Sequence, residues 1–173
     1  MRVDLAVLSD YATMTADQKL VIVGVFDTIL VHALPAAHPS LHLALRVCIG
    51  PEDTGAHSLL VRLVDPDGRE VIPALKADFD ADIPMDGDQG ALQMVLEIGP
   101  VPFAAEGPHA VDILIDDRYE DAVPLRIKLT SHPELRGQVP RHRTLRDYVV
   151  ADAVATIDEL LRLEGGAHRD EGS

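Results

Sequence analysis

The sequence contains few aromatic and few basic residues. Phe, Tyr and Trp make up 3% of the 173 residues and Trp is absent, so the ring surfaces on which proteins stack sugars or single-stranded nucleic acids are scarce. Lys and Arg number 15 against 29 Asp and Glu, which gives a formal charge of −14 that would repel a phosphate backbone. The composition therefore argues against nucleic acid as a partner.

The sequence also lacks a second cysteine and any long hydrophobic run. Cys48 is the only cysteine, so it cannot form an intrachain disulfide, and its place in the apolar run 43–49 predicts a small buried side chain. No stretch has the length of a membrane span, and Asp4 interrupts the region where a signal peptide would be apolar. We expect a cytoplasmic protein in a reducing compartment, with no membrane partner.

Apolar residues are abundant, and they recur in short segments. The 47% hydrophobic and 25% charged content is that of a globular protein. Segments rich in Val, Ile and Leu are separated by Pro, Gly and Asp, which predicts an all-β fold over residues 1–130: an antiparallel Greek-key β-sandwich, immunoglobulin-like or C2-like, of about eight strands. The expected strands are 3–13, 19–31, 41–50, 57–65, 69–77, 91–99, 109–116 and 122–129.

Turn residues predict two hairpins. The turn Asp65-Pro66-Asp67-Gly68 joins the strand before it to the strand that begins at Arg69, because Pro presets φ and Gly accepts positive φ. Residues 116–121 join the last two strands, and Pro124 predicts an edge strand or a bulge. The acidic, interrupted segment 78–90 predicts a long loop.

The C-terminal part of the sequence predicts one amphipathic helix. Residues 131–143 read as a linker, Thr144 can cap a helix over 144–164, and residues 165–173 predict a disordered tail. At helical spacing, one half of the circumference is apolar. We expect this face to contact either the same chain or a protein partner, through Leu145, Val149, Val150, Val154, Ile157, Leu160 and Leu161.

Several short stretches occur in a distinctive order along residues 1–130. They are Asp4-Leu5-Ala6, Asp10-Tyr11-Ala12, Lys19-Leu20, Gly24-Val25-Phe26-Asp27, Pro35-Ala36-Ala37-His38-Pro39, Asp65-Pro66-Asp67-Gly68, Gly107-Pro108-His109, Ile115-Asp116 and Val123-Pro124-Leu125-Arg126. Together they resemble an uncharacterised family of small bacterial single-domain β-sandwich proteins, a domain of unknown function. The resemblance implies the fold and no catalytic residue, and this chain has His109 where members often carry an aromatic residue.

The acidic loops contain the candidate metal ligands. Calcium takes several carboxylate oxygens, and a calcium site could draw on Asp65, Asp67, Asp78, Asp80, Asp82, Asp86 and Asp88. An EF-hand loop that begins at Asp78 fails, because Ile83 stands at the turn glycine and Gln89 at the bidentate glutamate. The alternative is that these residues are a solvated acidic loop and that Asp65 and Asp67 fix their own turn, so we expect no cofactor, with calcium as the exception to test.

Other sites have weaker signals. His38 and His42, with His32 as a third, could hold zinc, but no thiolate or carboxylate falls at a usual ligand spacing. Motifs for nucleophilic catalysis, phosphate binding and dinucleotide binding are absent. An enzyme or small-ligand receptor would instead need a polar pocket in the sandwich, lined by residues such as His57, Asp10 and Arg46.

Three functions therefore remain open. The first is a non-enzymatic module that binds a protein, with itself as a dimer the expected partner. The second is an enzyme or small-ligand receptor with a pocket in the sandwich. The third is a calcium-binding module.

Overall fold

The computed structural model describes residues 1–82 and 90–131 of the chain. These residues are nearly all β, as predicted, with one short 3-10 helix. The elements are β1 (Arg2–Met14), β2 (Leu20–Phe26), β3 (Thr28–Val31), β4 (Ala36–His38), β5 (Leu41–Ile49), η1 (Pro51–Asp53), β6 (Gly55–Val64), β7 (Leu75–Ala81), β8 (Gly90–Ile98), β9 (Val101–Phe103), β10 (Gly107–Ile115) and β11 (Arg118–Leu129).

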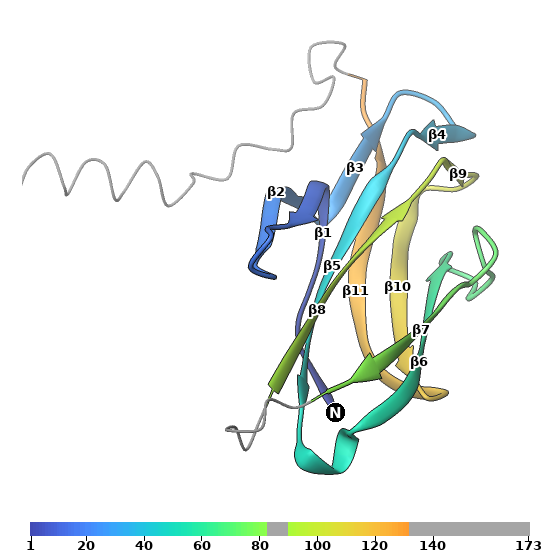
Figure 1. Cartoon of the computed structure of the whole chain (residues 1–173). Helices are drawn as coiled ribbons and strands as arrows, with labels where there is room; N and C mark the ends of the chain where they lie inside the picture. Colours follow the sequence, from blue (N-terminus) through green and yellow to red (C-terminus); the bar gives the residue numbers. More distant parts are fainter. Residues whose placement is uncertain (83–89, 132–173) are drawn as a thin grey trace, which may run out of the picture. The chain divides into compact units, whose positions relative to one another are not determined.

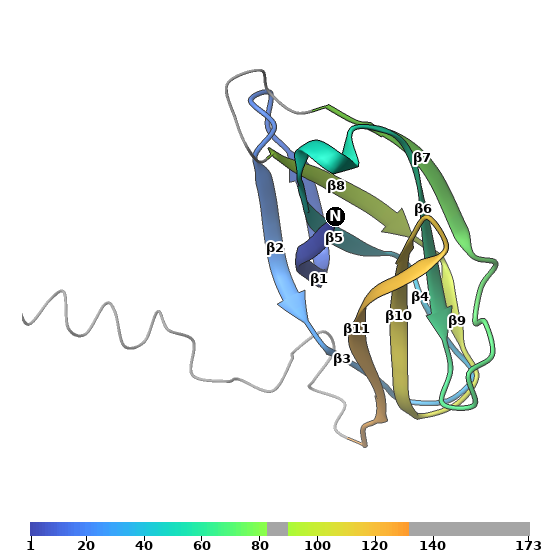
Figure 2. The same ribbon diagram turned by 90° about the horizontal axis from the view of Figure 1, so that it is seen from below.

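Two larger sheets enclose one apolar core (Figures 1 and 2). The first has the strand order β2-β1-β5-β8 and the second has the order β3-β11-β10-β6-β7. A small β4-β9 ladder lies at one end. The ladders are antiparallel, as predicted, except that β3 runs parallel to β11.

The strands at the centre of each sheet supply most of the core. Alternate residues of β5 and β10 are fully buried, because successive side chains of a strand point to opposite faces. The largest fully buried side chains include Leu43, Leu45, Leu59, Phe103 and Ile113. His109 is buried with them, and its ring meets the ring of Phe103 edge-on at a centroid distance of 5.3 Å.

The predicted strand 19–31 is two strands in different sheets. The chain leaves the first sheet after β2 and enters the second at β3, and Asp27 is the residue between them. The carbonyl of Asp27 accepts a hydrogen bond from the backbone N–H of Arg126 at 2.7 Å, which ties the crossing point to β11. The prediction of about eight strands was also wrong in missing β4 and β9, which are too short to show a period in sequence.

The turn at residues 65–68 forms as predicted, but the strand after it does not. Gly68 N–H donates to the Asp65 carbonyl at 2.9 Å, and one bridge joins Val64 to Glu70. The ladder with β6 resumes only at Leu75, because Pro73 has no N–H to donate. The second strand is therefore β7, at 75–81 and not 69–77.

The predicted loop 78–90 begins inside β7. Phe79 and Ala81 point toward the core, while Asp78 and Asp80 point to solvent. β7 is the edge strand of its sheet, and charged side chains on such an edge discourage pairing with another chain. The acidic residues therefore indicate an edge strand where the sequence was interpreted as a loop.

The last hairpin is tighter than predicted. Asp116 and Asp117 form a two-residue turn in which both φ angles are positive, 50° and 62°, and β11 begins directly after it. Aspartate is among the few residues other than glycine that adopt this geometry, which matches the twist of a hairpin. The prediction that Pro124 marks an edge strand or a bulge was wrong, because β11 lies between β3 and β10 and the ladder with β10 is regular at Pro124. Proline is tolerated there because β3 pairs with β11 only from Arg126 onward.

Cys48 lies outside the core, against the prediction. It is half-buried on the outward face of β5, where strand alternation also places Arg46. Its Sγ lies 3.2 Å from Oδ2 of Asp4, and Asp4 in turn forms an ion pair with Arg46. Asp4 stands at an irregularity in the register between β1 and β5.

The predicted linker, helix and tail lie outside the described residues, apart from Ser131. The predicted contact residues of the helix, from Leu145 to Leu161, therefore lie outside them too. Asp86 and Asp88 of the acidic segment also lie outside the described residues. The described part of the chain contains no helix with the length and hydrophobicity that a membrane crossing requires.

Candidate functional site

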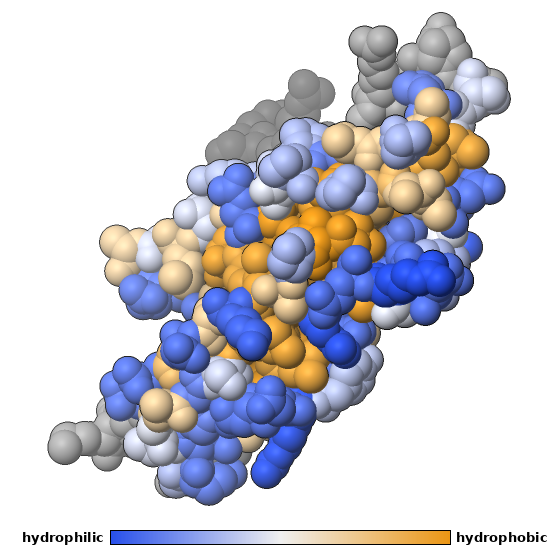
Figure 3. All heavy atoms as spheres, turned by 90° about the vertical axis from the view of Figure 1, so that its right-hand side faces the viewer, coloured by the Kyte–Doolittle hydropathy of each residue, from blue (hydrophilic) through white to orange (hydrophobic). Residues whose placement is uncertain are grey.

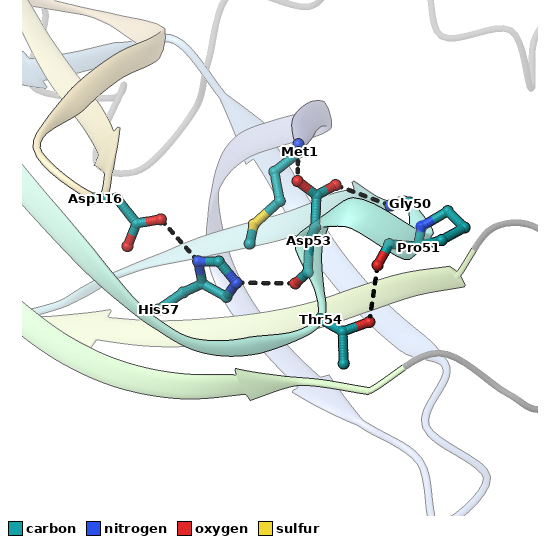
Figure 4. A network of polar contacts seen from close by, with 7 residues as sticks. All are labelled: Met1, Gly50, Pro51, Asp53, Thr54, His57 and Asp116. Atoms are coloured by element: carbon teal, nitrogen blue, oxygen red, sulfur yellow. Dashed lines mark hydrogen bonds and ion pairs between the residues drawn. The ribbon is translucent and has the colours of Figure 1, made fainter.

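A polar network at the start of β6 joins three distant parts of the chain (Figure 4). His57 of β6 reaches Asp116 in the β10-β11 turn, with 2.7 Å between Nδ1 and Oδ2. The other ring nitrogen, Nε2, lies 2.8 Å from the backbone carbonyl of Asp53 in η1. The Asp53 carboxylate accepts hydrogen bonds from the backbone N–H of Gly50 and from the amino group of Met1, both at 2.8 Å.

The partners of His57 determine its protonation. A carbonyl oxygen and an ionised carboxylate oxygen only accept hydrogen bonds, so both ring nitrogens must donate to them. A histidine that donates from both nitrogens is the charged imidazolium. With Asp116 ionised, His57 therefore makes both hydrogen bonds as the cation, and in this form it connects η1 to the β10-β11 turn.

Electrostatics support this protonation state. The hydrogen bond from His57 to Asp116 raises the pKa of the imidazole above its ordinary value, against an opposing effect of partial burial. The same bond, with a second one from the backbone N–H of Ser58, lowers the pKa of Asp116. The hydrogen bond from Gly50 N–H and the amino group of Met1 lower the pKa of Asp53.

The network should stabilise the fold over a limited pH range. The contribution of His57 is complete below its unfolded-state pKa, about 6.5, and is lost as the pH rises through its raised folded-state pKa. The contributions of Asp53 and Asp116 are complete above their unfolded-state pKa, about 3.9, and are lost as the pH falls through their lowered folded-state values. The full contribution is therefore expected between about pH 4 and 6.5.

Replacing Asp116 by asparagine is expected to reduce the free energy of unfolding by about 1 kcal/mol near pH 5.5, since exposure of the carboxylate to water weakens the ion pair. The difference from the wild type should shrink as the pH rises through the raised pKa of His57, since the imidazole then loses its charge and the ion pair with Asp116 is lost. Thermal unfolding followed by circular dichroism between pH 5 and 9 measures this. Asp117→Asn, in the same turn, is the matched control and should follow the wild type; parallel pH profiles for Asp116→Asn and the wild type would contradict the ion pair.

The network has no catalytic arrangement in the described residues. An aspartate beside a histidine is typical of a nucleophile-activating dyad, but Nε2 of His57 is occupied by the Asp53 carbonyl and cannot accept a proton. The nearby hydroxyl of Thr54 donates to the carbonyl of Pro51 at 3.2 Å. A hollow of about 240 Å³ beside Met1 and Asp53 is smaller than most small-molecule sites.

The structure does not bring together the residues proposed for a pocket. His57 belongs to the network described above, in the second sheet. Arg46 lies on the outward face of the first sheet and pairs with Asp4. Asp10 is exposed on β1, and its carboxylate lies over Gly24, which has a positive φ of 69°. Each of the three residues has its own surroundings.

The aspartates proposed for calcium have local partners or point to solvent. Oδ1 of Asp65 accepts hydrogen bonds from the backbone N–H groups of Asp67 and Arg69 at 2.9 and 2.8 Å, which fixes the turn. Oδ2 of Asp67 pairs with the guanidinium of Arg69. Asp78, Asp80 and Asp82 are exposed. Within residues 1–82 and 90–131, no three His, Cys, Asp or Glu side chains are grouped closely enough to hold a metal ion.

The histidines proposed for zinc also lie apart. The ring of His38 packs edge-on against Phe26, and burial lowers the pKa of His38. The ring of His42 meets that of Tyr11 on the outward face of the first sheet. His32 Nδ1 lies 3.3 Å from the backbone carbonyl of Thr130.

The sequence interpretation missed an exposed apolar stripe on β1 and β2. Of the seven large apolar side chains that are exposed in the described residues, five lie between Tyr11 and Val25. Four of them share the outward face of the β1-β2 ladder, in which Tyr11 stands opposite Val23. We call these four the valine stripe: Tyr11, Val21, Val23 and Val25, of which Val23 and Val25 are 54% and 58% exposed.

β2 is also a sheet edge without the usual protection. Its sequence, Leu20–Phe26, has no charged residue and no proline. The other three edges of the two larger sheets differ: β7 carries Lys76 and two aspartates, β8 carries Glu97, and β3 has four residues. Free backbone groups and exposed valines on one edge make a template for another strand.

The side of the molecule formed by β6, β7 and β9 also has apolar surface, but there it belongs to the margin of the core. Figure 3 shows a broad apolar patch, bordered by polar side chains, on the side of the molecule where Figure 1 places β6, β7 and β9. The partly buried side chains of Val71, Ile72, Leu75 and Phe79 pack against the core, so they form its rim. The valine stripe, by contrast, lies on the outward face of its sheet.

A family model described as a family of unknown function, DUF6941, matches residues 4–128. The chain belongs to this family. None of the curated proteins matches it. Among solved structures, a glycosyl hydrolase family 2 member from Bacteroides cellulosilyticus DSM 14838 is similar at 17% identity and a TM-score of 0.32, over 55% of this chain and 14% of that one.

The DUF6941 match contains both features described above. β2 and the three residues Asp53, His57 and Asp116 lie within residues 4–128. The family description assigns no activity to either feature. Any function has to come from the chemistry of this chain.

Proposed function

We propose that the chain is a non-enzymatic protein-binding module, built on a Greek-key β-sandwich, that accepts a strand of a protein partner at the free edge of β2. The observation that carries the proposal is the unprotected edge itself. β2 forms one edge of the first sheet, and its seven residues include no charged residue and no proline. The valine stripe lies beside the backbone groups of β2 that face away from β1. Strand addition uses both: the backbone supplies affinity and the side chains supply specificity.

The surroundings of β2 favour a stable docking edge over a frayed one. Phe26 at the end of β2 is buried, and the β1-β2 register stays constant from Met14 to Leu8. The edge is therefore held in place before a partner arrives, which reduces the ordering entropy lost on binding.

The polar clusters of the described residues support a non-enzymatic role. The hydrogen bonds of His57, Asp53 and Asp116 join parts of the fold to one another. Asp4, Arg46 and Cys48 form a second group of this kind on the outward face of the first sheet. Both groups stabilise the scaffold that holds β2.

A synthetic strand tests the proposal. A peptide of residues 19–27, with two lysines added at each end for solubility, should bind the ¹⁵N-labelled full chain and shift the backbone amide signals of β2 most. Val23→Lys should weaken binding of the peptide at least about tenfold, because its ammonium group would face an apolar strand. Leu129→Lys makes the same kind of change at an exposed site of β11 and should bind the peptide like the wild type. Signal changes that are absent in a sample in which the chain is monomeric, or that are centred away from β2, would refute strand addition.

A further inference from the structure

We infer that the strand received at β2 comes from a second copy of the same chain, so that two β2 strands pair antiparallel across a twofold axis. This inference rests on the proposed strand addition at β2 and names its partner. Pairing of this kind would join two four-stranded sheets into one continuous sheet. A twofold contact requires a surface that is complementary to itself, and the sequence of β2 and its flanks has that property.

The apolar residues match when Val23 lies on the axis. Val23 then faces Val23 of the other copy, and Val21 faces Val25. Directly opposite residues of an antiparallel pair point to the same side of the sheet, so the two valine stripes become one. The regular register between β1 and β2 shows that β2 keeps its alternation across Gly24 despite the positive φ of that residue.

The charges at the two ends of β2 match in the same register. Lys19 precedes β2 and Asp27 follows it, and both are exposed. With Val23 on the axis, Lys19 of each copy comes to the end of the ladder where Asp27 of the other leaves it, which gives two pairs of opposite charge. The Asp27 carboxylate accepts a hydrogen bond from the Thr28 hydroxyl, and its second oxygen can face the ammonium group. Lys19 already forms an ion pair with Asp17, but both side chains are mostly exposed, so this ion pair contributes little to stability and leaves the ammonium free to reach a new partner.

Neighbouring registers lose this match. An axis at Ile22 places Lys19 opposite Val25 of the other copy, so that an ammonium group meets an apolar side chain. An axis at Gly24 places Val21 opposite Asp27. The register centred on Val23 is therefore favoured over both neighbours by charge and by side-chain contact.

The overall charge favours contact at this edge. A formal charge of −14 makes two copies repel each other over most of their surface. β2 is an uncharged stretch of seven residues with one cation and one anion at its ends, so two copies meet there without net repulsion. β7 carries two aspartates and cannot offer this.

Sedimentation equilibrium of the full chain over a concentration series tests the inference. The wild type and Leu129→Lys should show dimers, whereas Val23→Lys should weaken association at least about 100-fold, because the axis would bring two ammonium groups together without partners. Circular dichroism should show that both variants remain folded. A wild type that is monomeric at millimolar concentration, or a Val23→Lys variant that dimerises like the wild type, would overturn the second copy as partner.

A charge exchange tests the register. Lys19→Asp alone and Asp27→Lys alone should each weaken dimerisation about tenfold, since each places like charges opposite each other twice. The double variant Lys19→Asp/Asp27→Lys should recover the wild-type dissociation constant to within about threefold. If either residue had only a local role, the double variant would not recover its affinity. A double variant whose loss of dimer affinity equals the losses of the two single variants combined would therefore overturn the register.

A cysteine at position 23 tests whether the two copies of this residue lie close together, and this test does not depend on measuring affinity. In a Cys48→Ser background, Val23→Cys should form a disulfide-linked dimer on oxidation, because residues opposite each other in antiparallel strands have Cα atoms about 4.5–5.5 Å apart. Tyr119→Cys, at a site that is 62% exposed against 54% for Val23, should remain uncrosslinked at the same concentration. Two outcomes separate this inference from the proposed strand addition. If the chain is monomeric and Val23→Cys does not crosslink, but the peptide of residues 19–27 still binds to β2, the dimer is refuted and strand addition stands. If the peptide also fails to bind to the monomeric chain, both are refuted.

Discussion

Replacing Phe103 by alanine is expected to lower the free energy of unfolding by about 3–5 kcal/mol, the largest effect of any single substitution considered for this chain. Phe103 is 1% exposed and is among the largest fully buried side chains. Its ring lies perpendicular to that of the buried His109, so removing it leaves a cavity and also exposes the imidazole to an apolar void. Chemical denaturation followed by far-ultraviolet circular dichroism measures the loss, which is suitable because the chain lacks tryptophan.

Two controls separate burial from ring chemistry. Phe79→Ala removes the same atoms from a half-buried site on the edge strand β7 and should cost about half as much. Phe103→Leu keeps most of the volume and should cost about 1–2 kcal/mol. If Phe103→Ala cost no more than Phe79→Ala, then the end of the core near β9 would be looser than the burial of Phe103 indicates.

The central strands were the part of the fold that the sequence predicted best. β5 and β10 lie within a residue or two of the predicted strands 41–50 and 109–116. Their sequences alternate, or are apolar throughout, because both strands have neighbours on either side and one face in the core. A period of two residues survives in such strands because every inward side chain is buried.

The edges were predicted less well, because what happens at an edge depends on the neighbouring strand. Residues 75–81 form a strand only because β6 offers its backbone groups, and the acidic residues among them gave the pattern of a loop. The crossing at Asp27 depends on a hydrogen bond with Arg126, almost one hundred positions away. Neither partner is visible in the local sequence.

The candidate sites were missed for similar reasons. Asp53, His57 and Asp116 are ordinary residues for loops and strand ends, and the hydrogen bond between His57 and Asp116 joins positions 59 apart. The sequence of β2 is typical of a buried central strand, and nothing in it indicates that the strand ends its sheet. The signal that could have helped is the alternation of Val21, Val23 and Val25, which is meaningful only once their face is known to be exposed.

The close approach of Gly99 to a neighbouring segment predicts a second large effect. A Cβ at position 99 would lie 2.5 Å from the carbonyl oxygen of Pro39 and 2.8 Å from Cα of Ser40. Both are backbone atoms of the segment between β4 and β5, so they cannot rotate away as a side chain can. Gly99→Ala is therefore expected to cost up to about 3 kcal/mol through overpacking, measured by the same denaturation experiment.

Gly50→Ala isolates the steric cause. Neither glycine has a positive φ, so alanine is compatible with the backbone at both positions. At position 50 the nearest atoms to a new Cβ belong to the carboxylate of Glu52, which is exposed and can swing out, and the backbone N–H still donates to Asp53. Gly50→Ala should therefore change the free energy of unfolding by less than about 0.5 kcal/mol. Equal losses at the two positions would mean that the segment between β4 and β5 yields as easily as a surface side chain, and that the β4-β9 ladder is held less firmly than the buried Val101 and Phe103 imply.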